Sequence, residues 1–423
     1  MNIINNPQPC EWAALCERNA PSDEQVMESV RAIVESVRKE GDQALRRFAH
    51  DFDCATITDI ELTDDERTLL AAQTSAEVQQ AIQHALHNIQ AFHKAQKPMM
   101  VEVETQPGVH CVQKAVPIQR VGLYIPGGRA PLFSTVLMLA APAVIAGCKE
   151  IVLCTPQGAD GHIAPEIIYA ANICGIHHIY RVGGAQAIAA MAYGTESISC
   201  VDKIFGPGNR YVTHAKQLVS THTAIDMPAG PSEVLVMADQ TAHPDYVAAD
   251  MLSQAEHGPD SQAILVCNSM TLAQQVAAEV ERQTALLPRR ELVEQSLSHS
   301  RIIVLPTRQE MLQFSNAYAP EHLILSVENP WQMAEGVTAA GSVFVGNYSP
   351  ESAGDYASGT NHTLPTSGWA RSYSGVNIDS FMRKITFQEL TQEGLQALAP
   401  TIVTMAEAEG LHAHAQAVRV RKS

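Results

Sequence analysis

The sequence predicts an α/β fold made of two Rossmann-like doubly wound parallel-sheet units, with N-terminal helices and a C-terminal helical tail. From Arg120 to Val345, short apolar runs alternate with helical stretches in two consecutive series, a rhythm typical of parallel strands joined by helices. The chain has 423 residues, too many for one ordinary core, so two or more domains are expected. It is 46% hydrophobic but only 5% aromatic, which suits α/β layers better than an all-β sandwich.

The first series occupies residues 120–225. Its expected strands are Val121–Ile125, Ile151–Cys154, Ile179–Val182 and Lys203–Phe205. Helical stretches follow them, from Ser134 to about Ala146, from Ala164 to Ile173, from Ala185 onward and after Asn209. Glycine-rich turns come after several of these strands, at the edge where open α/β sheets bind ligands. We therefore expect a ligand crevice at the carboxyl ends of these strands.

The second series occupies residues 226–375. Its expected strands are Val234–Met237, Ala263–Val266, Arg301–Val304, Leu323–Ser326 and Ser342–Val345. A helix carrying Gln254 lies between the first two strands, and a long charged helix follows the second. The segment Ser349–Gly375 is polar and rich in glycine, serine and tyrosine, which is typical of a functional loop.

The two ends of the chain are expected to be helical. Within residues 1–119, apolar residues recur at helical spacing from about Ser22 to Lys97, with a second amphipathic stretch at Ser75–Gln96. We expect this N-terminal region to pack on the second Rossmann-like unit and to cover a core. Within residues 376–423, two short helices are predicted at Thr391–Leu398 and Thr401–Glu409, broken at Pro400. These terminal helices have little core of their own, so docking on a partner subunit is expected.

Charge and cysteine usage restrict the partners and the compartment. Lysine plus arginine number 28 against 45 for aspartate plus glutamate, a net charge of −17 that disfavours nucleic acid and anionic membranes. Nine scattered cysteines without a Cys-x-x-Cys pair indicate buried thiols in a reducing compartment. No secretory pattern follows Met1, and the longest apolar run, Val136–Cys148, is too short to span a bilayer. A cytoplasmic protein with no membrane contact is the expectation.

Two kinds of motif have both a chemical and a structural interpretation. Gln254 and His257 are spaced i, i+3 before Gly258-Pro259, so one face of a helix end could hold a metal or simply a hydrogen-bonded polar pair. The turns Val182-Gly-Gly-Ala-Gln and Phe205-Gly-Pro-Gly-Asn could bring backbone N–H groups to a pyrophosphate, or only allow tight turns.

Other ionisable residues also stand near strand ends and in loops. Glu321 and His322 precede a buried strand, where they could transfer protons or form a surface polar pair. Asp355, with His412 or His414 of the tail, would complete a nitrogen and oxygen donor set suited to Zn²⁺. Spacing alone leaves open that these are unrelated polar loop residues.

Seven long motifs, in order along the chain, resemble those of the histidinol dehydrogenase family. The resemblance covers nearly the whole chain and is weakest before about residue 100. The motifs are Val121-Gly-Leu-Tyr-Ile-Pro-Gly-Gly, Val182-Gly-Gly-Ala-Gln-Ala-Ile-Ala-Ala, Lys203-Ile-Phe-Gly-Pro-Gly-Asn, Ile225-Asp-Met-Pro-Ala-Gly-Pro-Ser-Glu-Val, Leu252-Ser-Gln-Ala-Glu-His-Gly-Pro-Asp, Ala319-Pro-Glu-His-Leu and Ser352-Ala-Gly-Asp-Tyr-Ala-Ser-Gly-Thr-Asn-His.

The resemblance implies a zinc-dependent, NAD-linked enzyme of histidine biosynthesis. Such an enzyme oxidises L-histidinol to L-histidine in two hydride transfers, through L-histidinal that stays bound. Residues 120–225 would then bind NAD, and residues 226–375 would carry zinc, one ion per subunit, and the catalytic residues. The family also implies a homodimer in which the C-terminal tail is exchanged between subunits.

The resemblance also assigns roles to residues. The zinc ligands would be Gln254, His257, Asp355 and His414, with His414 preferred to His412 because it lies three residues before Ala417-Val418. Glu321 and His322 match the acid–base pair. Ser232 and Glu409 match substrate contacts, together with His322 and the four zinc ligands, and NAD contacts match Tyr124, Gln186 and Asn209.

Three rival functions are weighed against this one. A relative with the same apparatus could act on another alcohol, such as a sulfonated diol, although Glu409 suits a cationic amine instead. A non-catalytic zinc- and nucleotide-binding protein would have no need of both Glu321 and His322. A zinc hydrolase would turn over without NAD.

Overall fold

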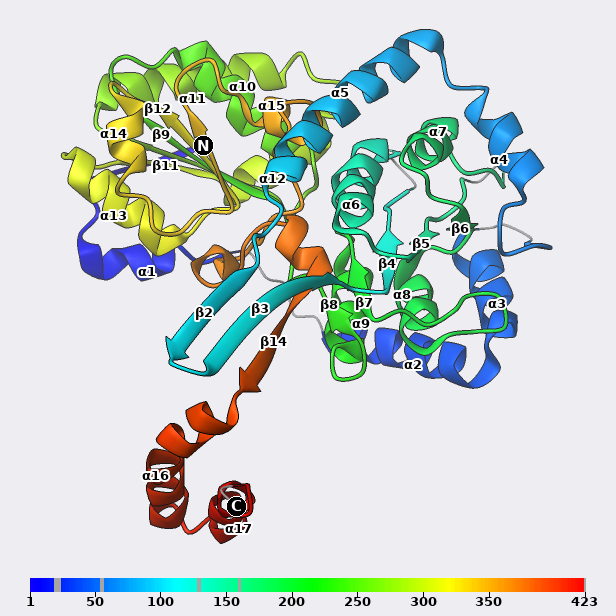
Figure 1. Cartoon of the computed structure of the whole chain (residues 1–423). Coiled ribbons are helices and arrows are strands. Elements are labelled where there is room, and N and C mark those ends of the chain that lie inside the picture. The colour runs from blue at the N-terminus through cyan, green and yellow to red at the C-terminus, as the bar shows by residue number, and fades with distance from the viewer. Residues whose placement is uncertain (19–23, 54–56, 128–130, 159–160, 422–423) are drawn as a thin grey trace.

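Two separate parallel sheets, one in each of two α/β units, carry the fold of this computed structural model (Figure 1). The structure describes residues 1–18, 24–53, 57–127, 131–158 and 161–421. The first sheet has the order β6-β5-β4-β7-β8, with every neighbouring pair parallel. Its strands are β4 (Arg120–Tyr124), β5 (Glu150–Cys154), β6 (His178–Tyr180), β7 (Lys203–Phe205) and β8 (Ala224–Ile225).

The second sheet repeats this arrangement and adds one strand. Its order is β1-β11-β10-β9-β12-β13, again with every neighbouring pair parallel. Its strands are β1 (Asn2–Asn5), β9 (Glu233–Ala238), β10 (Gln262–Cys267), β11 (Arg301–Val304), β12 (His322–Ser326) and β13 (Ser342–Val345). Numbered along the chain from β4 and from β9, both sheets read 3-2-1-4-5, and β1 extends the second at its β11 edge. The predicted pair of Rossmann-like sheets is confirmed.

Helices cover both faces of the first sheet. One face packs on α6 (Phe133–Ala146) and α7 (Pro165–Ile173), with Val121 and Leu123 of β4 in the shared core. The other face packs on α8 (Gly184–Tyr193) and α9 (Arg210–Val219), with Val152 of β5 and Ile204 of β7. Since both faces are covered, the strands are apolar throughout rather than alternating.

The second sheet is covered in the same way. The bounds of its helices are α10 (Pro244–Ala255), α11 (Met270–Thr284), α12 (Arg290–His299), α13 (Arg308–Tyr318), α14 (Pro330–Ala334) and α15 (Glu351–Tyr356). The helices α10, α11 and α12 cover one face, while α13 and α14 cover the other. A short N-terminal element, η1 (Pro9–Glu11) with α1 (Trp12–Leu15), joins the second face, where Trp12 packs edge-on against Phe314.

The expected packing of the N-terminal helices is wrong for most of the region. The helices are α2 (Glu24–Glu40), α3 (Asp42–Asp53), α4 (Asp64–Ala71) and α5 (Ala76–Ala95), and all four pack on the first unit. The elements β1, η1 and α1 pack within the second unit, and α5 also contacts it through Asn88 and His93. Ser22, the expected helix start, lies outside the described residues. An amphipathic pattern shows that a helix buries one face, but it does not identify the surface that covers that face.

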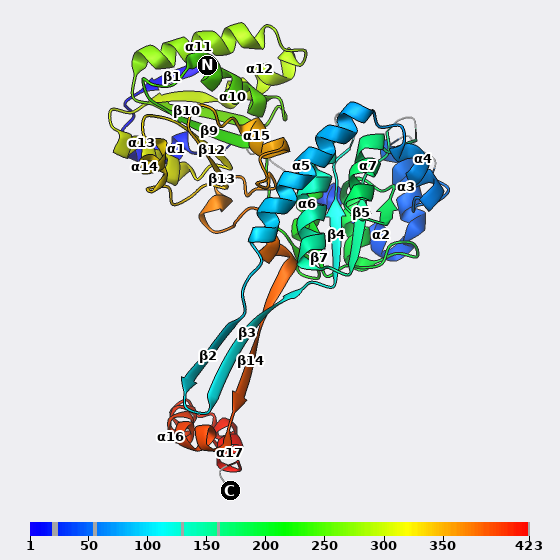
Figure 2. The same ribbon diagram turned by 45° about the horizontal axis from the view of Figure 1, so that its top comes forward.

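A three-stranded antiparallel sheet projects away from both units as an arm (Figure 2). Its strands, in the order β14-β3-β2, are β2 (Val101–Gln106), β3 (Val109–Pro117) and β14 (Met382–Leu390). The sequence prediction placed these residues in helical regions and is wrong here. The alternation of Val101 and Val103 with glutamates is a strand pattern, but both valines are about half exposed, so no buried face marked the strand.

Two helices, α16 (Gln392–Ala408) and α17 (His412–Arg419), lie at the tip of the arm (Figures 1 and 2). The predicted break at Pro400 is wrong, because α16 continues through this proline. Proline removes one helical hydrogen bond, yet its fixed φ is compatible with helix. Short 3-10 helices, η2 (Trp369–Arg371) and η3 (Ile378–Phe381), lie between the second unit and the arm. Among the described residues, no helix is both long and apolar enough to cross a bilayer.

Candidate active site

Ionisable side chains converge at the amino edge of the second sheet. His322 is the first residue of β12, Glu321 precedes it, and Ser232 precedes the neighbouring strand β9. The helix α10 connects the parallel strands β9 and β10, so it runs back along the sheet and ends at this same edge. Gln254 lies in its last turn, whereas His257 lies beyond its end at Ala255 and not in the helix as expected.

The helix α15 brings two carboxylates to this edge. Glu351 and Asp355 are four residues apart, so they share one helix face. Asp355 Oδ1 lies 3.6 Å from His322 Nε2, and Asp355 Oδ2 lies 4.0 Å from His257 Nε2. On the other side of the ring, His322 Nδ1 lies 3.6 Å from Glu321 Oε2 and 4.0 Å from Glu351 Oε1. The imidazole of His322 is thus surrounded by three carboxylates.

Burial and mutual repulsion perturb the acids and bases of this cluster. Burial raises the pKa of Glu321 to about 8 and that of Glu351 to about 8. Burial opposes protonation of His322, but the neighbouring carboxylates, Glu351 foremost, outweigh it and raise the pKa of His322 to about 10. Burial likewise opposes the charge of Asp355, yet the charged imidazole of His322, whose Nε2 lies 3.6 Å from Asp355 Oδ1, holds the pKa of Asp355 below its usual range. Such concentrated perturbation is typical of a functional site.

The donor atoms of this edge fit a divalent cation. One ligand atom from each of His257, Glu351 and Asp355 lies within 4.8 Å of the others. Both ring nitrogens of His322 are buried without a hydrogen-bond partner among the described residues. Imidazole nitrogen and carboxylate oxygen are donors that Zn²⁺ accepts in catalytic sites.

Gln254 is fully buried between the Glu351 carboxylate and the backbone of Glu233. With its amide nitrogen towards Glu351, it donates to Oε2 over 2.9 Å, and its oxygen accepts from Glu233 N–H over 3.0 Å. The opposite orientation places the amide oxygen against the carboxylate oxygens. A cation shared by the two groups would remove this repulsion, so Gln254 also fits a metal site.

Glu351 is the residue that sequence reasoning missed. It lies in the Ser349–Gly375 segment, which the sequence predicts to be a loop, and it is almost completely buried. Its i, i+4 spacing to Asp355, directly after Pro350, was visible in the sequence. The helix itself is only six residues long, too short for a periodic signal.

The structure does not bring the two tail residues to this cluster. Glu409 is the residue that follows α16, and His414 lies in α17; both are exposed. These helices stand at the tip of the arm, far from the second sheet in both views (Figures 1 and 2). Within one chain, therefore, the other predicted zinc ligands assemble without His414.

The first unit gathers the three predicted cofactor residues at its carboxyl edge. Tyr124 ends β4, and its hydroxyl accepts a hydrogen bond from Gly184 N–H at the start of α8 (3.1 Å). Gln186 is buried in the first turn of α8, and Asn209 caps α9, its side-chain oxygen accepting from Val212 N–H (3.2 Å). The strand order reverses between β4 and β7, so this edge is the switch point of the sheet.

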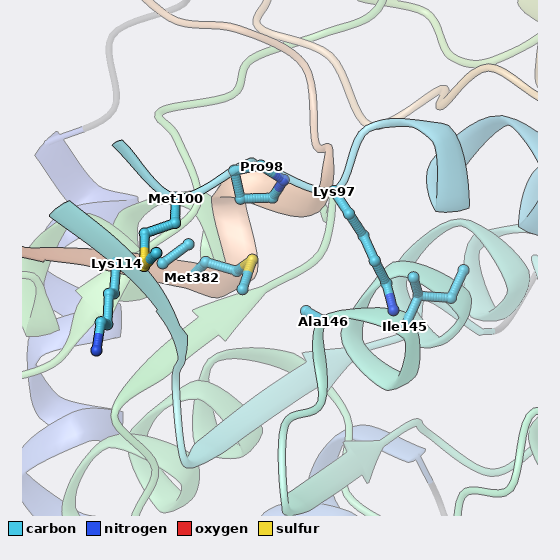
Figure 3. Close-up of a pocket in the computed structure, with 8 residues that line it drawn as sticks. Lys97, Pro98, Met100, Lys114, Ile145, Ala146 and Met382 are labelled. Atoms are coloured by element: carbon cyan, nitrogen blue, oxygen red, sulfur yellow. The ribbon is translucent and has the colours of Figure 1, made fainter. Parts of the chain in front are cut away.

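A separate cavity lies at the root of the arm (Figure 3). Its lining combines lysine stems with apolar side chains: Lys97, Pro98, Met100, Lys114, Ala115, Ile145, Ala146 and Met382. None of the predicted site residues lines it. The cavity lacks the acids and imidazoles that the amino edge of the second sheet concentrates.

Comparison with known proteins agrees over the full length of the chain. The sequence model of the histidinol dehydrogenase family matches residues 16–422. The chain is 55% identical to a histidinol dehydrogenase of Bacteroides thetaiotaomicron over 422 residues, covering 100% of this chain and 99% of that protein. It is 53% identical to one from Vibrio parahaemolyticus over 412 residues, with coverage of 96% and 95%. The crystal structure of histidinol dehydrogenase from Elizabethkingia anophelis superposes with a TM-score of 0.97, 54% identity and coverage of 100% and 98%.

Proposed function

The chain belongs to the histidinol dehydrogenase family, and we propose that it performs a four-electron oxidation at the amino edge of its second sheet. It is an NAD-dependent oxidoreductase that converts histidinol to histidine in histidine biosynthesis. The proposal adds that L-histidinol passes through bound L-histidinal with two NAD, beside one zinc ion per subunit. The observation that carries it is the convergence of Glu321, His322 and the acids of α15 on one edge.

The proposed zinc ligands are Gln254, His257 and Asp355, with His414 supplied by the tail of a second subunit. Ser232, His322 and Glu409 would contact the substrate. Zinc, when bound, supplies a positive charge that holds the substrate amine unprotonated and draws the pKa of the neighbouring imidazole down from its carboxylate-raised value. Glu409, a carboxylate, would accept a hydrogen bond from an N–H group of the substrate.

His322 acts as the base in both oxidations. It accepts the hydroxyl proton of histidinol as the C–H hydride leaves for NAD, which yields the aldehyde. Glu321 then removes a proton from water as the water adds to this aldehyde, and protonated His322 returns its proton to the carbonyl oxygen, which gives the neutral hydrate. His322, again neutral, accepts a hydroxyl proton of this hydrate as the second hydride leaves for a second NAD. Glu321 Oε2 lies 3.6 Å from His322 Nδ1, so both side chains can act on the same bound substrate.

A cysteine nucleophile plays no part in this scheme. Burial raises the pKa of Cys148 to about 12, and burial also raises the pKa of Cys154 and Cys267, so these thiols stay protonated and unreactive. They lie in or beside helices and strands of the two cores, and none adjoins the acid–imidazole cluster. In this scheme, activated water adds to the aldehyde in place of a cysteine thiolate.

The cofactor-binding edge is assigned to the first unit. Tyr124, Gln186 and Asn209 would contact NAD where the helices α8 and α9 begin. Backbone N–H groups and the positive ends of helix dipoles favour pyrophosphate there, so the site needs no general positive field. This suits a chain whose net charge is −17.

We infer that the working form is a homodimer with exchanged tails. The arm sheet is nearly devoid of core, since Val101, Val103, Ile385 and Phe387 are all exposed. An exposed apolar sheet of this kind needs a covering surface, and the tail carries Glu409 and His414 away from the site of its own chain. We further propose a cytoplasmic location, supported by the free thiols of all eight cysteines in the described residues.

The stoichiometry of NADH tests the reaction. The zinc-loaded protein at mildly alkaline pH should form two NADH per L-histidinol, lose this activity on chelation and regain it with zinc. One NADH with free aldehyde would remove the role given to Glu321. No NADH at all would contradict the proposal and favour a related alcohol as substrate.

Complementation tests the exchanged tail. His322→Asn and His414→Asn should each be nearly inactive as homodimers. When the two are co-expressed equally, half of the dimers are mixed and each mixed dimer holds one intact site, so about a quarter of wild-type activity should return. If His414 served its own chain, no dimer would hold an intact site, and no activity would return.

A further inference from the structure

A buried ion pair lies beneath the carboxyl edge of the first sheet, outside every role assigned so far. Lys216, on α9, meets Asp226, the residue after β8, through Nζ and Oδ1. Their side chains are only 5% and 1% exposed. Removing one partner alone would leave an uncompensated charge in the core, so the two residues act as a unit.

The pair holds Gly206 by both polar groups of its backbone. Gly206 N–H donates to Asp226 Oδ2 over 2.8 Å, and Gly206 C=O accepts from Lys216 Nζ over 2.9 Å. Both bonds are charge-assisted and shielded from water, which makes them stronger than ordinary backbone bonds. Gly206, the first residue of the turn after β7, is therefore held through both its N–H and its C=O.

The turn also touches the neighbouring strand end. Gly206 has a φ of +129°, and a Cβ at this position would lie 2.1 Å from the carbonyl oxygen of Tyr124. Only glycine fits here, because the chain passes directly against the end of β4. Fixing Gly206 therefore fixes the spacing between Tyr124 and the turn that leads to Asn209, two of the proposed cofactor contacts.

Asp226 links this turn to the second unit. Its N–H donates to Ile204 C=O over 3.0 Å, and its Oδ1 accepts from Met227 N–H over 2.7 Å. Residues 226–232 then run to Ser232 and into β9. One carboxylate thus holds both the turn of the cofactor edge and the first residues of the chain segment that leads to the substrate edge.

We propose that Lys216 and Asp226 are positioning residues that preorganise the Gly206–Asn209 turn for the cofactor. This inference rests on the proposed assignment of the first unit to NAD. A turn that is already rigid loses less entropy on binding, so the pair raises cofactor affinity without touching the cofactor. Loss of the bond from Lys216 to the Gly206 carbonyl lowers cofactor affinity and leaves zinc and histidinol binding at the other sheet unchanged.

Two double variants of equal charge and similar size isolate the Gly206 carbonyl bond. In Lys216→Gln with Asp226→Asn, amides replace both charges and each can still bond Gly206. In Lys216→Met with Asp226→Asn, the carbonyl of Gly206 loses its donor. Both variants are then compared by calorimetry with NAD and with histidinol, by steady-state kinetics and by zinc analysis.

The Met-containing variant should show a Kd and KM for NAD about tenfold above those of the Gln-containing variant. Its kcat at saturating NAD, its zinc content and its histidinol affinity should stay within about twofold. Equal NAD affinity in the two variants, or an equal loss of histidinol affinity, would overturn the inference. A wild-type chain that binds no NAD would instead refute the proposed function itself.

If neither double variant folds, amide hydrogen exchange of the wild-type protein tests the inference instead. A preorganised turn predicts that, without NAD, the Gly206 N–H exchanges about as slowly as the amides of β4 and β7, and that NAD slows all of these amides by the same factor. Exchange at Gly206 that is fast without NAD, and that NAD slows more than about tenfold beyond the strand amides, would show that the cofactor, and not the ion pair, orders the turn.

Discussion

The two Rossmann-like units share one strand order but use opposite edges of their sheets. The first gathers Tyr124, Gln186 and Asn209 at its carboxyl edge, as expected for an open α/β sheet. The second gathers its acids and imidazoles at the amino edge, where β9 and β12 begin. Strand order alone therefore does not determine where a site forms, and the chemistry at each edge must be considered.

Helix polarity gives a physical reason for this difference. In a parallel sheet with connecting helices, the carboxyl edge meets helix N-termini, whose positive ends and free N–H groups favour anions. The amino edge meets helix C-termini, such as the end of α10 beside Gln254, whose negative ends favour cations. A pyrophosphate and a zinc ion thus suit opposite edges of the same fold.

The largest loss of activity is expected when the proposed general base of the second unit is removed. His322→Asn should lower kcat by about three orders of magnitude, because a positioned general base is lost. NAD affinity at the first unit should be unchanged. Calorimetry and steady-state kinetics measure both quantities, and His87→Asn, on the exposed face of α5, is the control. A matching loss of NAD affinity would show that the two edges are not separate sites.

Glu351 should contribute to metal retention through Gln254. Glu351→Gln removes the carboxylate that the amide of Gln254 faces, so zinc affinity should fall by about 10- to 100-fold. Competition with a chromophoric chelator measures this affinity. Glu335→Gln, at an exposed position after α14, should leave it unchanged. Unaltered affinity in Glu351→Gln would remove this residue from the metal site.

Two N-cap residues, one in each unit, distinguish an effect on unfolding free energy from an effect on cofactor binding. Asn209→Ala and Ser269→Ala each remove a side-chain N-cap, of α9 and α11, and each should cost about 1 kcal/mol of unfolding free energy. Only Asn209→Ala should also raise the KM for NAD, by about tenfold for a lost hydrogen bond. Chemical denaturation and kinetics measure the two effects. An equal rise in KM for Ser269→Ala would contradict the assignment of the cofactor edge.

The smallest effect concerns acid stability at α5, which lies between the units. Burial lowers the pKa of His93, whose ring contacts Ile89 C=O (2.8 Å) and Asn361 of the second unit. The folded chain keeps this ring neutral while the unfolded chain binds a proton, so unfolding free energy falls as pH drops below about 6.5. Urea titrations at pH 7.5 and 5.5 should show a smaller loss for His93→Gln than for wild type. An equal loss would assign acid sensitivity to other groups.

The elements of the two sheets could be predicted closely from the sequence. The strands β7, β11 and β13 have the expected bounds, since continuous apolar runs between glycine-rich turns are a strong local signal. The arm strands could not be predicted, because Val101 and Val103 face no core of their own chain. Most site residues came from resemblance to a family, and Glu351 was missed because its helix is one short segment in a polar loop.

The sequence by itself determined the two alternating series, the glycine turns and the separation of acidic and imidazole motifs from those turns. These are local properties, set by backbone freedom and by the periodicity of apolar residues. Only the tertiary structure decided that α2 to α5 cover the first unit, that α15 brings Glu351 beside His322, and that Lys216 and Asp226 hold Gly206. Each of these depends on contacts between residues distant in sequence, which local patterns do not encode.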